Sequence, residues 1–230
     1  MTEAEVVAVV PARGGSTGFP GKNLAPFLGR PLLTHAISAG ADAKRVSRVL
    51  VSTDDEQIGQ AAIEAGAELV RRPVELAGPT SRTVDAVLHA VDHCRLPDEA
   101  VVVLLQPTTP LRTAADVDEC LDLHDGRHTG SVVQVSSSAE HHPWKSCVLV
   151  DGRLTPVREW ADLEAPRQLL PAVLRPTGGV YVVCAGDLRS QRRFFVPEVL
   201  AQQIPPERAV DIDTEDDLRR AEELARTMLS

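Results

Sequence analysis

The sequence predicts an α/β fold in which a mostly parallel, Rossmann-like sheet is flanked by helices. Two observations lead to this prediction. Continuous apolar, β-branched runs such as Val6–Pro11 and Ala100–Leu105 are typical of strands that are buried on both faces. Between such runs lie segments with helical periodicity, and strands that alternate with helices of this length indicate right-handed βαβ crossovers.

The expected elements follow this rhythm along the first part of the chain. Strands are expected at Val6–Pro11, Arg48–Ser52, Glu68–Val70, Ala100–Leu105 and Gly130–Val135. Helices are expected at Pro31–Asp42, Asp54–Ala65, Thr83–Cys94, Ala114–His124 and, at the end of the chain, Thr214–Leu229. Thr53 or Asp54 is placed to cap the second of these helices.

The rhythm breaks between Ser136 and Pro176. This segment contains both tryptophans, Trp144 and Trp160, several prolines and no clear periodicity. The length of 230 residues fits one domain with a sizeable core. We therefore expect a single domain over residues 1–230, with residues 136–176 as an inserted arm.

Composition excludes several classes of protein. There are 24 basic and 33 acidic residues, for a net charge of −9, and an acidic chain without a basic block is poorly suited to bind nucleic acid or an anionic membrane. No apolar run approaches the ~20 residues of a membrane span, and no secretory signal is evident. A cytoplasmic location is expected. The four scattered cysteines form no CxxC pair, which favours reduced thiols over disulfides or a zinc site.

The first candidate site is a glycine-rich, cationic segment. Residues 6–41 contain no Asp or Glu but include Arg13, Lys22 and Arg30. Directly after the first strand, GGSTGFPG at 14–21 would let backbone N–H groups approach an anion. In open α/β sheets ligands bind at the carboxyl ends of strands, where this loop lies. The segment matches neither the Walker motif nor the GxGxxG motif. The alternative to an anion-binding loop is a glycine-rich turn with a purely structural role.

A second candidate site is the pair Asp211 and Asp213. On a strand covering Ala209–Asp213, both carboxylates would point to one face, roughly 6.6 Å apart along the chain. Two such carboxylates suit a hard cation such as Mg²⁺. Alternatively, Asp213 or Thr214 caps the last helix, with Asp217 closing a capping box at Thr214, although capping gives no reason for Asp211.

A third candidate is the segment LQPTTPLR at 105–112. Its two prolines fix a rigid loop at the end of a buried strand, which is a suitable place to mount a recognition group. Taken alone, the segment is ambiguous between a turn and a site.

Together these motifs resemble the CMP-sialic acid synthetases (acylneuraminate cytidylyltransferases) and their phosphonate-activating relatives. The matching segments occur in the family's order along nearly the whole chain. They are PARGGSTGFPGKN (11–23), VSTDD (51–55), RPVELAGPTSRTVDAVLHAV (72–91), LLQPTTPLR (104–112), HHPWK (141–145), RPTGGVY (175–181) and VDIDTEDDLRRAE (210–222).

The resemblance implies a reaction. An acid's hydroxyl or oxyanion attacks the α-phosphorus of CTP, pyrophosphate leaves, a CMP conjugate forms, and Mg²⁺ is required. Arg13, Lys22 and Asp211 are the implied catalytic residues, and Asp211 with Asp213 is the implied metal site. The implied nucleotide-binding residues are Ala12, Arg13, Gly14, Gly15, Ser16, Lys22, Asn23, Arg72, Ser81 and Thr83. The implied acid-binding residues are Gln106, Lys145, Arg167, Arg175, Tyr181, Phe194 and Phe195.

The resemblance also implies a homodimer, in which the arm at 136–176 packs across a two-fold axis and reaches the neighbour's site. Trp144 and Trp160 are candidate anchors, because interfaces favour aromatic residues.

Three positions depart from the sialic-acid pattern. Thr17 replaces a lysine of the glycine loop, Pro79 an aspartate and Thr177 an asparagine. Cytidylyl transfer is retained as the expected activity, and the identity of the acid is left open. A sialic-acid-like nonulosonic acid is slightly ahead on motif count, and a small phosphonate is the alternative. Alternatives of other kinds are a catalytically weak nucleotide-binding module and a nucleotidyltransferase for another base and a sugar phosphate.

Overall fold

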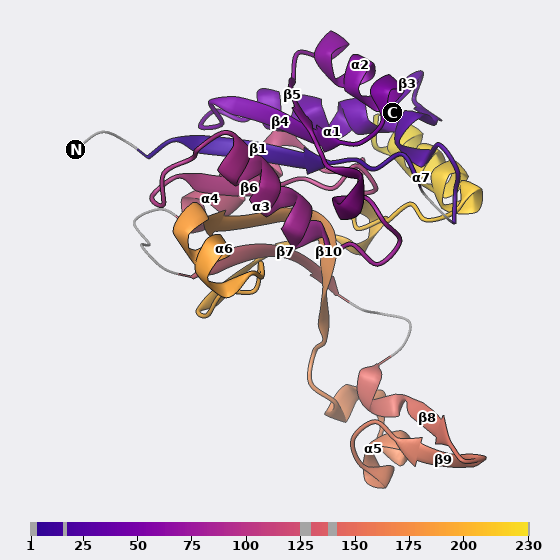
Figure 1. Cartoon of the computed structure of the whole chain (residues 1–230). Coiled ribbons are helices and arrows are strands. Elements are labelled where there is room, and N and C mark those ends of the chain that lie inside the picture. The colour runs from indigo at the N-terminus through magenta and orange to yellow at the C-terminus, as the bar shows by residue number, and fades with distance from the viewer. Residues whose placement is uncertain (1–3, 16–17, 125–129, 138–141, 230) are drawn as a thin grey trace.

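The computed structural model describes residues 4–15, 18–124, 130–137 and 142–229 (Figure 1). In this part of the chain the central sheet has seven strands, and parallel pairing prevails except at β10, which is antiparallel to both neighbours. The expected mostly parallel sheet is confirmed. From edge to edge the order is β11 (Val199–Ile204), β7 (Ser131–Ser137), β10 (Leu174–Cys184), β6 (Val101–Leu104), β1 (Val6–Pro11), β4 (Arg48–Thr53) and β5 (Glu68–Arg71).

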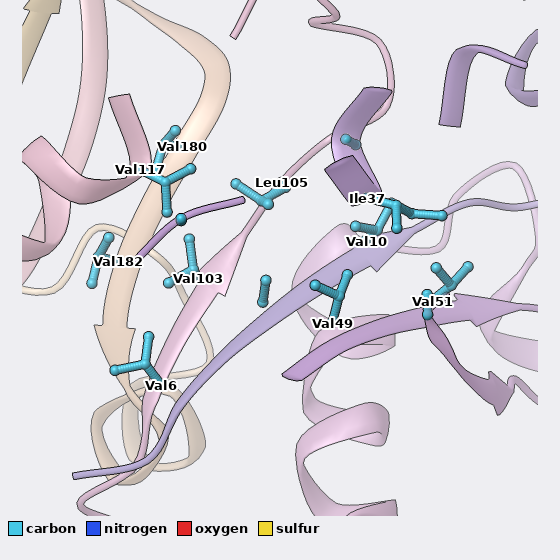
Figure 2. Packing of buried hydrophobic residues seen from close by; sticks show 14 of the residues in the cluster. Val6, Val10, Ile37, Val49, Val51, Val103, Leu105, Val117, Val180 and Val182 are labelled. Carbon is cyan, nitrogen blue, oxygen red and sulfur yellow. The ribbon is translucent and has the colours of Figure 1, made fainter. Parts of the chain in front are cut away.

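Helices cover both faces of this sheet, as the alternation of side chains along β1 requires. Val6, Ala8 and Val10 belong to one buried cluster, while Val7 and Val9 belong to another. The first cluster lies under α1 (Leu32–Ala41), α2 (Glu56–Glu64) and α4 (Ala114–His124), and the second under α3 (Thr83–His93) and α6 (Ala185–Gln191). Figure 2 shows members of the first cluster from β1, β4, β6, β10, α1 and α4.

Valine and alanine dominate these two clusters, in keeping with an aromatic content of only 3%. Each fully buried valine contributes roughly 1.5 kcal/mol or more to folding, so many small contributions replace a few large rings. The predicted elements before residue 136 are all present, with boundaries that differ by at most a few residues.

Two local expectations need correction. Asp55, and neither Thr53 nor Asp54, caps α2, because its Oδ1 accepts hydrogen bonds from the N–H groups of Gln57 and Ile58 at 2.8 and 2.9 Å. Residues 209–213 form no strand; Ile212 N–H donates instead to Thr108 O at 2.8 Å, so a loop contact replaces a sheet ladder.

The last helix, α7 (Glu215–Leu229), begins with the capping box. The Asp217 carboxylate accepts a hydrogen bond from Thr214 N–H at 2.8 Å, and Asp217 N–H donates to Thr214 Oγ1 at 3.2 Å. Behind it, Ile212 lies in a small core with Phe27 of β2 (Pro26–Phe27), which pairs with β3 (Arg30–Pro31). Because Thr214 serves as the cap, the Asp213 side chain is available for another role.

Residues 142–173 stand away from the sheet (Figure 1). They include the hairpin of β8 (Cys147–Val150) and β9 (Arg153–Pro156) and the short helix α5 (Trp160–Glu164). Their apolar side chains are largely exposed, including Leu149 at 71% and Leu169 at 77%. In the described part of the chain, no helix combines the length and the apolar character needed to cross a bilayer.

Candidate active site

A cavity of about 500 Å³ opens at the carboxyl ends of β1, β5 and β6. Four segments line it: the loop after β1, the connection from β5 to α3, the loop after β6, and residues 211–213. Nine residues expected from the sequence to bind nucleotide, metal or acid are among its lining, namely Arg13, Lys22, Asn23, Arg72, Ser81, Thr83, Gln106, Asp211 and Asp213. Segments far apart in the sequence thus meet where α/β sheets bind ligands.

Arg13 and Asn23 form the wall that follows β1. The Arg13 guanidinium donates to Gly78 O at 2.8 Å, which ties the glycine-rich loop to the segment before α3. Asn23 is buried, and its amide donates to Arg13 O at 2.9 Å. The chain on both sides of the loop is therefore fixed, and Arg13 presents its charge to the cavity.

Of the glycines in the loop after β1, Gly18 lines the cavity. Gly14 N–H donates to the carboxylate of Asp54, in the loop after β4, at 3.1 Å. This N–H group is therefore already hydrogen-bonded within the protein. Ala12 is buried, and neither it nor Gly14 nor Gly15 lines the cavity. Ser16 and Thr17 lie outside the described residues.

Lys22 connects the cationic loop to the aspartate pair. Its ammonium group donates to Ile212 O at 2.7 Å and lies 3.0 Å from Asp213 Oδ1. The Lys22 side chain is only 12% exposed, whereas that of Asp213 is 75% exposed. A nearly buried cation thus holds the 211–213 segment against the glycine loop, and the exposed carboxylate remains accessible from the cavity.

The surroundings of Asp211 raise its pKa. Loss of hydration at the cavity wall is the largest cause, opposed by a hydrogen bond with the Thr108 side chain. The charge of Asp213 raises the pKa further, while Lys22 and Arg175 lower it. A further cation near Asp211, in addition to Lys22 and Arg175, would lower its pKa again and favour the ionised carboxylate.

Asp211 and Asp213 fit a Mg²⁺ ion that also contacts a phosphorylated ligand. Among the described residues, no group of three or more His, Cys, Asp or Glu side chains could hold a metal. Mg²⁺ is typically held by one or two carboxylates, with substrate phosphates and water completing its octahedron. The donor set therefore fits this ion only together with a substrate.

Arg72 is a buried cation on the β5 side of the cavity. It donates to Ser52 O at 2.7 Å and to Leu76 O at 3.3 Å, and both of these acceptors are backbone carbonyls. Burial lowers the pKa of Arg72, an effect that the Asp54 carboxylate opposes. Arg72 shapes the loop before α3 while adding positive charge to the cavity wall.

Sequence reasoning missed Arg82, which also lines the cavity. Its guanidinium donates to both Asp85 oxygens at 3.0 Å, and Asp85 accepts a further hydrogen bond from Arg192 at 2.6 Å. The spacing of three residues between Arg82 and Asp85 signals the ion pair in the sequence. Nothing in that spacing reveals that the pair borders a cavity.

Of the residues expected to bind the acid, Gln106 lines the cavity, whereas Arg175, Tyr181, Phe194 and Phe195 lie outside its lining. The Tyr181 ring contacts those of Phe194 and Phe195, with centroid separations of 5.6 and 5.9 Å. Burial raises the pKa of Tyr181, and the charge of Asp211 raises it further. Arg175 donates to Ala209 O at 2.7 Å, next to the same segment. The three rings therefore form one aromatic cluster, and its Tyr181 is close enough to Asp211 to sense that charge.

Lys145 and Arg167 are not brought to this cavity. Both lie in the projecting segment, where the Lys145 ammonium donates to Leu163 O at 3.0 Å and Arg167 is exposed. Within one chain, these two cations are therefore separated from the other acid-binding candidates (Figure 1).

The chain is similar to several known proteins. Residues 7–140 match the family described as cytidylyltransferase. A CMP-N,N'-diacetyllegionaminic acid synthase of Legionella pneumophila is 30% identical over 226 residues, or 95% of each chain. An N-acylneuraminate cytidylyltransferase of Streptococcus agalactiae is 29% identical over 213 residues, which are 92% of this chain and 51% of that protein. The chain thus spans about half the length of the N-acylneuraminate cytidylyltransferases that it matches.

A solved structure shows the same fold. It is that of a CMP:2-keto-3-deoxy-manno-octonic acid synthetase complexed with CTP, with a TM-score of 0.72 and 20% identity, and the similarity covers 98% of this chain and 100% of that one.

Proposed function

The chain belongs to the cytidylyltransferase family, and from this premise we propose that it transfers CMP from CTP to a sialic-acid-like nonulosonic acid, with release of pyrophosphate. One observation carries the proposal: Arg13, Lys22, Asp211 and Asp213 line a single cavity at the carboxyl ends of the strands. Two cations and two carboxylates are the groups that a nucleoside triphosphate with its counter-ion needs.

The chemistry asks the protein mainly for position and charge. Arg13 and Lys22 bind the triphosphate and neutralise the charge that grows on the departing pyrophosphate. Asp211 and Asp213 would hold Mg²⁺, which when bound supplies positive charge to the phosphate oxygens. Residues 72–83 and Asn23 form the wall for the cytidine, and Asn23, Arg72, Ser81 and Thr83 are its polar groups.

The attacking oxygen belongs to the acid. Gln106, Arg175 and the rings of Tyr181, Phe194 and Phe195 form the surface on which we place this substrate. An apolar surface with one amide and one cation suits a molecule that carries both hydrocarbon faces and a carboxylate. The names of the relatives in Legionella and Streptococcus support a sugar acid. A small phosphonate is the contrasting substrate in the test below.

We further propose that the working enzyme is a homodimer. The projecting segment exposes Leu149, Leu169 and Trp160, which is 62% exposed, and such apolar side chains need a partner surface. Lys145 and Arg167 lie on the same segment, so packing against a second copy would carry these cations to the neighbour's cavity.

Pyrophosphate release tests the proposal. The enzyme is incubated with CTP, Mg²⁺ and either N-acylneuraminate-type acids or small phosphonates. We expect release with the sugar acids. Pyrophosphate release with phosphonates alone would refute the sugar acid as substrate, while the proposal of CMP transfer would stand. A thermal-shift comparison of CTP with UTP, ATP and GTP examines the base, and equal stabilisation by all four would contradict the choice of CTP.

A further inference from the structure

Arg112 is a buried arginine behind the cavity wall formed by the loop after β6. Only 6% of the residue is exposed. Its Nη1 donates to three acceptors: Gly179 O at 2.7 Å, Thr109 Oγ1 at 3.0 Å and Gln106 O at 3.1 Å. One guanidinium nitrogen therefore links the loop after β6 to the irregular stretch of β10, which are distant in the sequence.

This burial is costly. Desolvation lowers the pKa of Arg112 to about 10, and the Asp116 carboxylate only partly compensates, since Asp116 is hydrogen-bonded to Arg208 and Thr113. Nε and Nη2 of Arg112 have no hydrogen-bond partner within the described part of the chain. Buried charges without a paired carboxylate are poor sources of stability. The hydrogen bonds of Arg112 are therefore better explained by the geometry that they impose on the backbone than by a contribution to stability.

That geometry centres on the Gln106 side chain. Gly178 has a φ of +79°, and a Cβ placed there would lie 2.6 Å from Gln106 Oε1. The amide of Gln106 thus rests against the backbone at Gly178, one residue before the carbonyl that Arg112 holds. The pairing of β10 with β7 shifts register between Pro176 and Tyr181. Within this stretch Thr177 Oγ1 bonds to Gln134 Oε1 of β7 at 2.8 Å, and Arg112 ties the Gly179 carbonyl to the loop after β6.

The same loop also reaches the aspartate pair. Thr108 O accepts the hydrogen bond from Ile212 N–H, and the Thr108 side chain bonds to Asp211. Arg112 donates hydrogen bonds to Gln106 O and Thr109 Oγ1, and these two residues lie on either side of Thr108. The loop segment between these two positions is fixed at both ends by one side chain.

We propose that Arg112 is a positioning residue for the acid substrate: it holds the Gln106 carbonyl and the Gly179 carbonyl at a fixed separation, so that the Gln106 amide is presented to the cavity. Gly178 is the second part of this device, because only a residue without Cβ leaves room for the amide. The proposal rests on the proposed function, since it takes Gln106 as a contact of the acid.

Steady-state kinetics of pyrophosphate release test this inference, with CTP, Mg²⁺ and a turned-over sugar acid. We expect Gln106→Ala to raise the KM for the acid at least tenfold and to leave the KM for CTP within twofold. Arg112→Lys keeps the charge, but its side chain is one bond shorter, so the ammonium group does not reach the position of Nη1; we expect this variant to raise the KM for the acid fivefold or more. Gly178→Ala, which acts on the same amide from the other side, should do the same.

The double variants give the decisive comparison. If Arg112 and Gly178 act through Gln106, then adding Arg112→Lys or Gly178→Ala to Gln106→Ala changes the KM for the acid by less than twofold. Multiplicative effects, or an equal rise in the KM for CTP, would overturn the inference. Should Arg112→Lys fail to fold, Gly178→Ala with and without Gln106→Ala makes the same comparison.

Arg208→Lys is the matched control. Arg208 bonds to Asp116 and approaches Leu111 O at 3.4 Å, but it contacts neither Gln106 nor Gly179. The Arg208→Lys variant should have a lower melting temperature, and its KM values for the acid and for CTP should stay within twofold of the wild type. A wild-type enzyme that releases no pyrophosphate with any acid would refute the proposed function. An active enzyme whose variants keep the wild-type KM would refute the positioning role alone.

Discussion

The position of Lys22 is fixed by partners that are remote in the sequence, so its local sequence alone does not indicate what it contacts. Its partners, Ile212 O and Asp213 Oδ1, are about 190 positions away along the chain. The sequence predicted Lys22, Asp211 and Asp213 from charge and spacing, and they line one cavity. The contribution of Arg82 was not predictable, because the orientation of a helix start depends on tertiary packing.

Asp211→Asn separates function from stability at this site. Asp211 is exposed at the cavity wall, and the amide has nearly the same shape as the carboxylate, so the substitution removes the charge without leaving a void. We expect kcat to fall at least 100-fold while the melting temperature stays the same or rises. Asp216→Asn is the control: its side chain is 87% exposed on α7, and both quantities should be unchanged. Near-normal turnover of Asp211→Asn at limiting Mg²⁺ would refute the metal assignment.

Arg13→Ala removes one preorganised cation from the proposed triphosphate site. We expect a loss of about 3 kcal/mol in transition-state stabilisation, or roughly 100-fold in kcat/KM, with most of the loss in kcat. Arg71→Ala is the matched control, because that side chain is 72% exposed and lies 3.9 Å from Glu56. If kcat of Arg13→Ala equals that of the wild type, Arg13 does not act on the departing pyrophosphate.

Among the secondary-structure elements, strands buried on both faces and helices with one apolar stripe were predictable, because burial requires a regular local pattern of apolar residues. β10 was not, since Pro176 and two glycines give Leu174–Cys184 the composition of a turn. β11, at the sheet edge, lacks a clear alternation, and α6 has only seven residues. The ladder between β10 and β7 is interrupted in this stretch, where the register shifts between Pro176 and Tyr181 and Gly178 has a positive φ.

The junction between α1 and β2 predicts a pH dependence of stability. Burial lowers the pKa of His35, whose Nε2 hydrogen-bonds to Phe27 O at 2.9 Å, and the charges of Arg30 and Arg112 lower it further. The unfolded chain therefore binds the proton more readily. The contribution of neutral His35 is complete above the unfolded value of 6.5 and is lost as the pH falls toward the folded pKa.

Urea unfolding at pH 7.5 and pH 5.5 measures this effect. The wild type should lose more stability between these pH values than His35→Asn, because the variant has no titrating group at this position. Identical losses in both proteins would show that His35 titrates with its ordinary pKa in the folded state.

For the molecule as a whole, the projecting segment is the part that we expect to set the oligomeric state. Leu149→Asp places a charge on the exposed hairpin. We expect sedimentation to show a monomer at micromolar concentration, against a dimer for the wild type, and turnover to fall because Lys145 and Arg167 no longer reach a neighbour. Ile63→Asp, on an exposed position of α2, is the control and should stay dimeric. A wild type that sediments as a monomer at micromolar concentration would refute the proposed homodimer.

The sequence could not place residues 142–173 relative to the sheet, because a segment without its own core carries no periodicity that indicates its direction. Its separation from the cavity is visible only in the fold (Figure 1). This explains why Lys145 and Arg167 share a predicted role with Gln106 and Tyr181 but not a location.

The proposed function requires that one cavity joins CMP to an acid. This can be examined by identifying the products formed from CTP, Mg²⁺ and an N-acylneuraminate-type acid by mass spectrometry, together with a count of the pyrophosphate released. We expect one CMP conjugate for each pyrophosphate, and neither product with Asp211→Asn. Consumption of CTP without a conjugate, or a conjugate formed equally well by Asp211→Asn, would contradict the proposed function.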